Sequence, residues 1–249
     1  MNPGVFSSGY SVLMPRMLND PWKRLQSFLT FFKQRLLAHR SSLLLLLLGV
    51  YLPLQVFGEL AEDVWENEGG FPWDVPILLA IHSTARPQLD AFASALTKLG
   101  VFWGVFPVAI VTTLILLIQR RRHSLAYFIT TLIGSILINR TAKLLLHRVR
   151  PHLWVSPAPE FDYGFPSGHA MSSMTLVAAL VILTWGSRWC WTILIIGSLF
   201  VVAIGWTRLY LGVHYPSDIL AGWTVSIAWA VGVSLLINPR SIKPTSAKD

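Results

Sequence analysis

The sequence predicts an all-α, polytopic membrane protein: a bundle of six transmembrane helices with an N-terminal amphipathic helix and short interfacial helices. Composition is the first reason, because 53% of the 249 residues are hydrophobic and only 13% are charged, against about 25% charged in average globular chains. The second reason is a series of apolar stretches close to the roughly 20 residues that a helix needs to cross a bilayer. The third is that Lys and Arg gather mainly on one side of these stretches.

The segment before the first apolar stretch predicts a helix that lies on the membrane surface. From residue 22 to 37, apolar side chains recur every three or four positions with Lys and Arg among them, as in basic amphipathic helices at anionic membranes. An ordinary surface helix packed on the bundle is the alternative. We assign residues 1–41 to a cytoplasmic, amphipathic segment and expect no cleaved signal peptide, because cations rather than an apolar core come first.

Six apolar stretches follow, and each predicts a membrane span. They are Leu43–Phe57, Val101–Ile118, Leu125–Leu146, Ala170–Trp185, Trp189–Trp206 and Ile219–Ile237. The first and fourth are short, so we expect them to extend into flanking residues. Between the first two, Pro76 and Pro87 interrupt residues 72–99 and favour short interfacial helices over a seventh span. The membrane domain is therefore predicted at 42–238, with a cytoplasmic tail at 239–249.

The distribution of cations predicts the orientation of the spans. Most Lys and Arg residues lie before span one, after span six, or in the loops after spans two and four. This places both termini in the cytoplasm, with the protein in the inner (plasma) membrane. Five further cations collect at the outward ends of spans three and five: Arg140, Lys143, Arg148, Arg150 and Arg208. Cations on that side indicate an anionic ligand at the outer face.

A short polar turn, residues 165–169, precedes the fourth span. Pro166 suits the first turn of a helix, and Ser167 and Gly168 then leave unpaired backbone N–H groups that attract an anion. His169 adds a proton donor or acceptor beside them. A capping serine, a flexible glycine and an interfacial histidine would have the same sequence, so the turn alone leaves both interpretations open.

Two further clusters have suitable chemistry and spacing. Lys143 and Arg150 are seven residues apart, which places both on one face of a helix, although such cations also reach lipid headgroups. Asp218 follows His214 by four residues and can fix its tautomer, leaving the other ring nitrogen as a nucleophile; a structural hydrogen bond is the alternative. With Arg208, these groups suit a phosphoryl group, whose transition state spreads negative charge over three oxygens.

These segments resemble the motifs of the type-2 phosphatidic acid phosphatase superfamily, also called lipid phosphate phosphatases. That family shows Lys, six residues, then Arg-Pro; Pro-Ser-Gly-His; and Arg, five residues, His, three residues, Asp. This chain has the three motifs at 143–151, 166–169 and 208–218, in order and at the same spacing. Thr207 is a departure, because the third motif often has Ser before its arginine.

The resemblance implies a role for each matched residue. His214 is expected to be the nucleophile that forms a phosphohistidine, Asp218 to orient it, and His169 to act as general acid and then base. The expected phosphate ligands are Lys143, Arg150, Ser167, Gly168 and Arg208. The family needs no metal or other cofactor.

The resemblance also implies the reaction, which is hydrolysis of a phosphomonoester or diphosphate of an amphiphilic lipid. Phosphatidic acid, phosphatidylglycerol phosphate and polyprenyl diphosphate are candidate substrates, and the motifs do not choose among them. A lipid phosphotransferase using the same site and a membrane transporter are the alternatives. The expected partners are a lipid phosphate and the bilayer, without nucleic acid; the oligomeric state is not predicted. In the loop after span three, Glu160 and Asp162 have no assigned role, and the loop aromatics either line the site or enter lipid.

Overall fold

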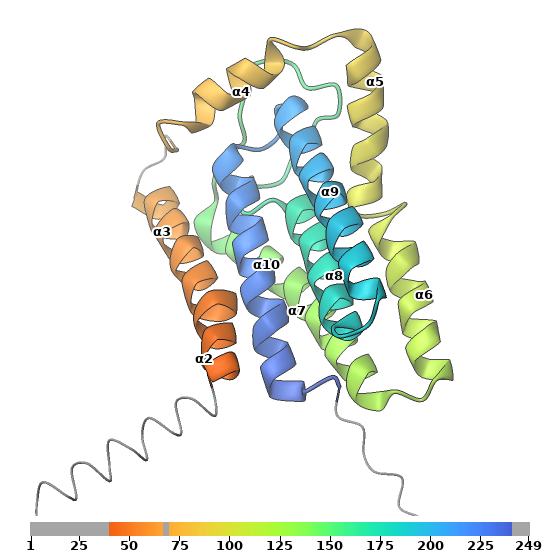
Figure 1. Ribbon diagram of the computed structural model, residues 1–249. Coiled ribbons are helices and arrows are strands. Elements are labelled where there is room, and N and C mark those ends of the chain that lie inside the picture. The colour runs from red at the N-terminus through yellow and green to blue at the C-terminus, as the bar shows by residue number, and fades with distance from the viewer. Residues whose placement is uncertain (1–39, 67–69, 241–249) are drawn as a thin grey trace, which may run out of the picture. The chain divides into compact units, whose positions relative to one another are not determined.

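The computed structural model describes residues 40–66 and 70–240, which contain helices and loops and no strand (Figure 1). The first helical segment runs without a break through α2 (Arg40–Leu46), the π-helical η2 (Leu47–Tyr51) and α3 (Leu52–Glu66). The other long helices are α6 (Val105–Ile118), α7 (Arg122–Leu146), α8 (Gly168–Thr184), α9 (Trp189–Tyr210) and α10 (Pro216–Ile237). Between α3 and α6 lie the short helices α4 (Asp74–His82) and α5 (Pro87–Leu96) and the 3₁₀ turn η3 (Thr97–Gly100). The all-α prediction is confirmed.

The apolar helices are long enough for a multi-pass membrane protein. Within the described residues, five segments have the length and composition of a span: Ser42–Glu66, Pro87–Ile118, Arg122–Leu146, Trp189–Tyr210 and Pro216–Ile237. The fourth predicted span corresponds to α8, which has only 17 residues, so the count of six stays a prediction. The first span extends to Glu66 as expected. The fourth does not extend at its far end, because Trp185 leaves the helical conformation and Gly186 has a positive φ of 84°.

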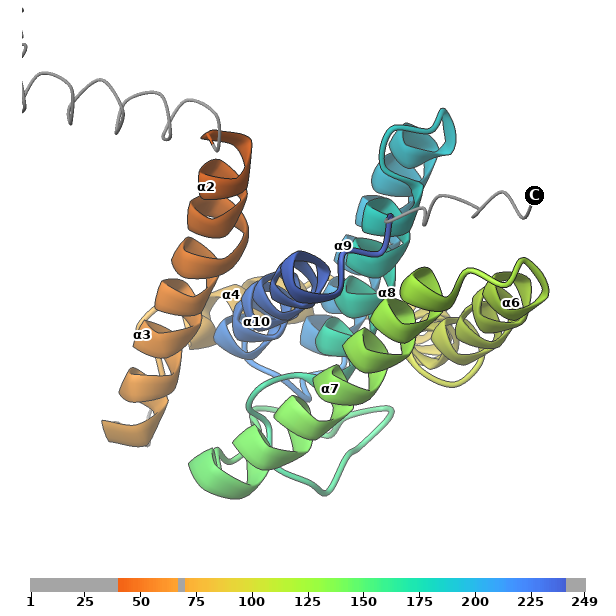
Figure 2. The ribbon, with the colours of Figure 1, turned by 90° about the horizontal axis from the view of Figure 1, so that it is seen from below.

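Helix α8 lies at the centre of the bundle. It packs against α7, α9 and α10, while α3 lies on the outer side of α10 (Figure 2). Leu176 of α8 meets the fully buried rings of Tyr127 and Phe128 from α7. Where α7 and α10 cross, a Cβ added at Gly134 would lie 2.1 Å from the Trp229 ring, so only glycine permits this approach.

The outer surfaces of the bundle are apolar. Large side chains such as Leu54 on α3, Phe106 on α6 and Leu199 on α9 are exposed. Contiguous apolar surface on this scale is typical of contact with lipid rather than with water.

Helix α4 lies across one end of the bundle and passes over the N-terminus of α10, whereas α5 runs down beside α9 toward α6 (Figure 1). Pro76 does not break α4, because it is the third residue of that helix, where a backbone N–H has no intrahelical acceptor. Pro87 opens α5 at its first position. Two short helices therefore form in the predicted region, but α5 falls within the candidate span Pro87–Ile118; a position of short helices at the membrane interface stays a prediction.

Because α8 is short, its N-terminus leaves a recess at this end of the bundle. Helices α8 and α9 are joined by a short turn at one end, but α9 has 22 residues and α8 has 17. At 1.5 Å per residue, the N-terminus of α8 lies about 8 Å below the end of its neighbour. The resulting recess is where the three sequence motifs meet. The helix predicted over residues 22–37 and most of the C-terminal tail lie outside the described residues, so the domain limits stay predictions.

Candidate active site

The N-terminus of α8 forms the floor of the recess. Ser167 is the N-cap, and its hydroxyl accepts from the amide of Ala170 at 3.5 Å. Two expectations are corrected here: Pro166 precedes the cap instead of opening the helix, and the amide of Ser167 donates to the carbonyl of Asp218 at 3.1 Å. Within the described residues, the amides of Gly168 and His169 have no acceptor, so two N–H groups at this helix start are available to an anion.

Lys143 and Arg150 do not share a helix face, which corrects the prediction. Helix α7 ends at Leu146, because His147 adopts a left-handed conformation with φ 46°. Arg150 therefore lies in the following loop. The two cations nevertheless meet: Lys143 Nζ and an Arg150 guanidinium nitrogen each lie 2.5 Å from an oxygen of Asp162.

His214 lies in the turn between α9 and α10 and is fully buried. Its Nδ1 is 3.3 Å from Asp218 Oδ2, and its Nε2 is 3.0 Å from an Arg150 nitrogen. A guanidinium can only donate, so Nε2 accepts, and the proton of the neutral ring resides on Nδ1 and faces Asp218. Burial, followed by the nearby Arg150 and Arg208, lowers the pKa of His214 well below its ordinary value. The ring is therefore neutral, and its lone pair lies on Nε2, where it accepts from Arg150.

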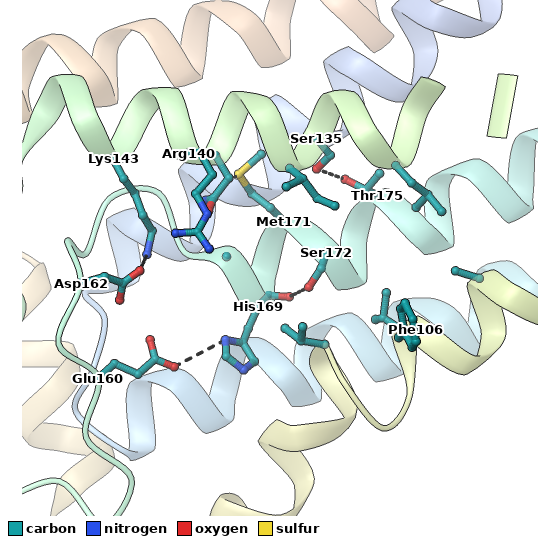
Figure 3. A pocket seen from close by; sticks show the side chains of 17 residues that line it. Phe106, Ser135, Arg140, Lys143, Glu160, Asp162, His169, Met171, Ser172 and Thr175 are labelled. Atoms are coloured by element: carbon teal, nitrogen blue, oxygen red, sulfur yellow. Dashed lines mark hydrogen bonds and ion pairs between the residues drawn. The ribbon is translucent and has the colours of Figure 1, made fainter. Parts of the chain in front are cut away.

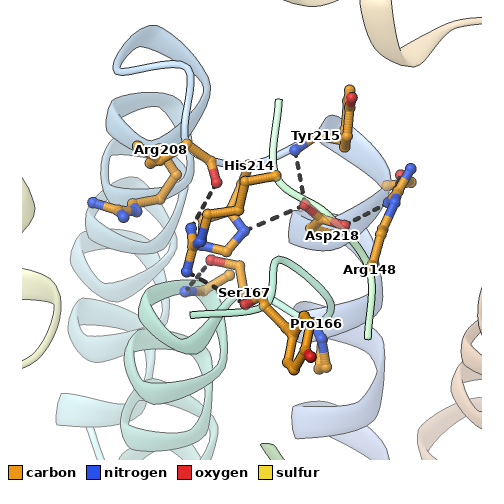
Figure 4. Close-up of polar contacts among 12 residues, drawn as sticks. Arg148, Pro166, Ser167, Arg208, His214, Tyr215 and Asp218 are labelled. Carbon is orange, nitrogen blue, oxygen red and sulfur yellow. Dashed lines mark hydrogen bonds and ion pairs between the residues drawn. The ribbon is translucent and has the colours of Figure 1, made fainter. Parts of the chain in front are cut away.

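Asp218 is held by a buried charge network that the sequence did not reveal (Figure 4). Its two oxygens accept from Arg148 at 2.5 Å and from the amide of Tyr215 at 2.8 Å. Arg148 also binds Asp74 of α4 at 2.8 Å, and Asp74 accepts from the amide and hydroxyl of Ser217 at 3.0 and 2.6 Å. Both aspartates are fully buried. The network fixes the carboxylate that orients His214.

Glu160, from the loop between α7 and α8, lies where the predicted phosphate ligands converge. Its carboxylate contacts Arg150 at 2.7 Å and forms an ion pair with Arg208, which is also bound to Thr97. The same carboxylate is 3.7 Å from His169 Nδ1 and 3.9 Å from His214 Nε2. Burial alone would raise the pKa of Glu160, but Arg208 and Arg150 together lower it below its ordinary value. An anion thus occupies the point that both imidazoles face.

The loop between α7 and α8 contributes both acidic and aromatic side chains near the site. Glu160 and Asp162 face the site. Burial alone would raise the pKa of Asp162, but Lys143 and Arg150 together lower it below its ordinary value. Trp154 stacks on His82 of α4 with 3.9 Å between ring centroids, whereas Phe161 is 96% exposed. The aromatic residues therefore do not act as one group.

A cavity of about 510 Å³ opens from this recess between α6, α7 and α8 (Figure 3). Lys143, Glu160, Asp162 and His169 lie at its polar end, and side chains such as Val105 line its apolar part. Among the described residues, no group of three or more His, Cys, Asp or Glu is arranged to hold a metal ion. The positive charge at the site comes from Lys and Arg side chains.

The structure thus brings all eight predicted site residues to one end of the bundle. The contributions of Asp74, Ser217 and Thr97 were not predicted, and Arg148 was predicted only as an outward cation. The position of Arg148 within the first motif was a usable signal. For Asp74 the sequence held no comparable signal, because it is simply a single acidic residue before an apolar segment.

Comparisons with known proteins agree with this arrangement. Residues 123–242 match the PAP2 superfamily. An undecaprenyl-diphosphatase from Sulfolobus acidocaldarius is 28% identical over 200 residues, covering 78% of this chain and 88% of that protein. A lipid A 4'-phosphatase from Bacteroides thetaiotaomicron is 30% identical over 170 residues, covering 60% of this chain and 70% of that protein.

The fold has a counterpart among solved structures. The crystal structure of a transmembrane PAP2-type phosphatidylglycerolphosphate phosphatase from Bacillus subtilis matches with a TM-score of 0.67 and 22% identity, covering 77% of this chain and 98% of that one. The matched region contains all three motifs, and the relatives are phosphatases of membrane lipids. The chain therefore belongs to the PAP2 superfamily and is a multi-pass membrane phosphatase that hydrolyses phosphate esters.

Proposed function

We propose that the chain removes a phosphate from a phosphomonoester or diphosphate of an amphiphilic lipid through a phosphohistidine on His214. The observation that carries the proposal is the position of Glu160. Its carboxylate lies between Arg150 and Arg208, with Nε2 of His214 at 3.9 Å, and this supports an anion site at that point. A substrate phosphate at that point would be held by the same cations and lie within reach of the lone pair.

The first chemical step transfers the phosphoryl group to the enzyme. His214 Nε2 attacks phosphorus as the bond to the leaving oxygen breaks, and Asp218 stabilises the positive charge that develops on the ring. His169, on the other side of the anion position, donates a proton to the leaving oxygen. Lys143, Arg150, Arg208 and the amides of Gly168 and His169 stabilise the charge on the equatorial oxygens.

The second step releases phosphate. Water attacks the phosphohistidine, the N–P bond breaks, and His169 accepts a proton from the attacking water, which restores its acid form. Ser167 would support the site by capping α8 and by donating its amide to the carbonyl of Asp218. The lipid tail would occupy the apolar cavity between α6 and α7, which has room for an acyl or prenyl chain.

Relatives named for undecaprenyl diphosphate, phosphatidylglycerol phosphate and lipid A suggest the range of substrates. We infer from the cation distribution that the site faces the outer side of the inner (plasma) membrane, with both termini in the cytoplasm. The deciding experiment measures phosphate release from a panel of lipid phosphates by the wild type and by His214→Ala. Release by the wild type and none by the variant is expected; substantial turnover by the variant would refute the nucleophile.

A lipid phosphotransferase remains the second candidate, because a phosphohistidine can pass its phosphoryl group to an alcohol or a phosphate as well as to water. A diphosphate lipid with a radioactive terminal phosphate, supplied with candidate acceptor lipids, distinguishes the two reactions. Label in inorganic phosphate indicates hydrolysis, and label in the acceptor indicates transfer.

A further inference from the structure

Of the two described cations that line the cavity, Lys143 and Arg140, only Lys143 is part of the ion-pair network. Lys143, Arg148, Arg150 and Arg208 each contact a carboxylate. Arg140 also lines the cavity and is exposed, but among the described residues it has no hydrogen-bond or ion-pair partner. Its charge is therefore available to a ligand.

Arg140 is placed next to the predicted phosphate site. It lies three residues before Lys143 on α7, so both side chains occupy the same face of the helix. Figure 3 shows the guanidinium directed into the cavity, between the Lys143–Asp162 pair and His169. A ligand that extends from the anion position into the cavity passes this group.

The chemistry of the leaving group assigns a role to that position. In the proposed reaction His169 protonates the leaving oxygen, so whatever that oxygen carries must lie on the cavity side of His169. In a monoester this is a carbon atom, which gains nothing from a guanidinium. In a diphosphate it is a second phosphate, for which a guanidinium is a strong, often bidentate partner.

We propose that Arg140 binds the second phosphate of a lipid diphosphate and makes this site selective for diphosphates over monoesters. The inference rests on the proposed function, because it takes the direction of the leaving group from that mechanism. The cavity beyond Arg140 becomes apolar at Val105 and Ala109 of α6, which suits the hydrocarbon that follows the second phosphate. A lone arginine at a helix end can also contact headgroups of bulk lipid; such a contact would not distinguish the two substrate classes.

The test compares two substrates that differ by one phosphate, farnesyl diphosphate and farnesyl monophosphate, with the full-length protein in detergent. Arg140→Gln is expected to lower kcat/KM for the diphosphate about 10- to 100-fold, the range for a lost hydrogen bond to a charged group. The monophosphate should change less than about threefold, on the scale of a weakly screened surface charge. Arg140→Lys should restore part of the loss. Lys98→Gln removes an exposed cation that does not line the cavity and should change neither substrate.

A second measurement separates this inference from the proposed reaction. Binding of a methylene-bridged farnesyl diphosphate analogue and of farnesyl phosphonate is measured on His214→Ala, with and without Arg140→Gln. If the wild type hydrolyses both substrates and Arg140→Gln lowers both equally or neither, the selectivity is refuted while the hydrolase stands. If the wild type hydrolyses neither substrate, the proposed reaction fails. In that case, weaker binding of the bridged analogue upon Arg140→Gln would still support the role of Arg140, and unchanged binding would overturn it.

Discussion

Replacement of Glu160 by glutamine should strengthen the binding of phosphate mimics. In the structure the carboxylate of Glu160 holds Arg150 and Arg208, so an incoming anion must first displace it. Gln preserves the shape of the side chain but removes its charge. A hydrogen bond to a charged group contributes about 1.5–3 kcal/mol, which corresponds to a factor of about 10 to 150 in affinity. Because Gln still offers an acceptor oxygen, we expect the lower part of that range.

The assay is competitive inhibition by orthovanadate, which can adopt the five-coordinate geometry of the phosphoryl transition state. The inhibition constant of Glu160→Gln should be about 10-fold lower than that of the wild type. Since the pKa of Glu160 is lowered, the difference should persist from neutral to mildly acidic pH. Glu59→Gln removes a charge from an exposed position on α3 and serves as the control. An unchanged or higher inhibition constant in Glu160→Gln would refute the view that this carboxylate occupies the phosphate position.

Four further outcomes are expected. Asp74→Asn removes a negative charge that compensates the buried Arg148, and it should lower the free energy of unfolding by on the order of 3 kcal/mol. The thermal unfolding midpoint should fall, and kcat should fall more than KM changes. Wild-type values for both would contradict the network. Chelators should leave activity intact, because Lys and Arg supply the positive charge, and a strict divalent requirement would contradict this. Because the pKa of His214 is lowered, the ring stays neutral, and kcat/KM should fall on the acid side only below about pH 6.5. A midpoint of that fall above about pH 6.5 would argue against His214 as the titrating base. Val155 is 95% exposed, so a cysteine introduced by Val155→Cys in a Cys190→Ser background should react with an impermeant thiol reagent from the outer face. Labelling from the cytoplasm would reverse the orientation.

The sequence predicted the helical class and the convergence of the motifs because both depend on local patterns. Apolar stretches define membrane helices, and successive membrane helices alternate in direction. The end of α7, the start of α8, the end of α9 and the start of α10 therefore fall at the same side of the bundle, which brings Lys143, His169, Arg208 and His214 together. That inference needed no knowledge of how the helices pack.

Predictions failed where the backbone departs from regular geometry or where contacts are distant in the sequence. The shared helix face of Lys143 and Arg150 assumed that α7 continued to Pro151, but a single left-handed residue, His147, ends it four residues earlier. Asp74 lies 74 residues before Arg148, and only the position of α4 over the bundle brings them together. Neither feature has a local sequence signal.

The charges of the described site explain why its carboxylates fall into two kinds. Four cations, Lys143, Arg148, Arg150 and Arg208, contact four carboxylates, Asp74, Asp218, Glu160 and Asp162. Buried cations without compensation would be costly, so the site without substrate needs these anions. The carboxyl groups of Asp74 and Asp218 are fully buried, whereas the side chains of Glu160 and Asp162 are 27% and 52% exposed and lie on a loop. A phosphate dianion can therefore replace the two loop carboxylates without a change in net charge, while the two buried aspartates continue to hold Arg148 and, through Asp218, His214.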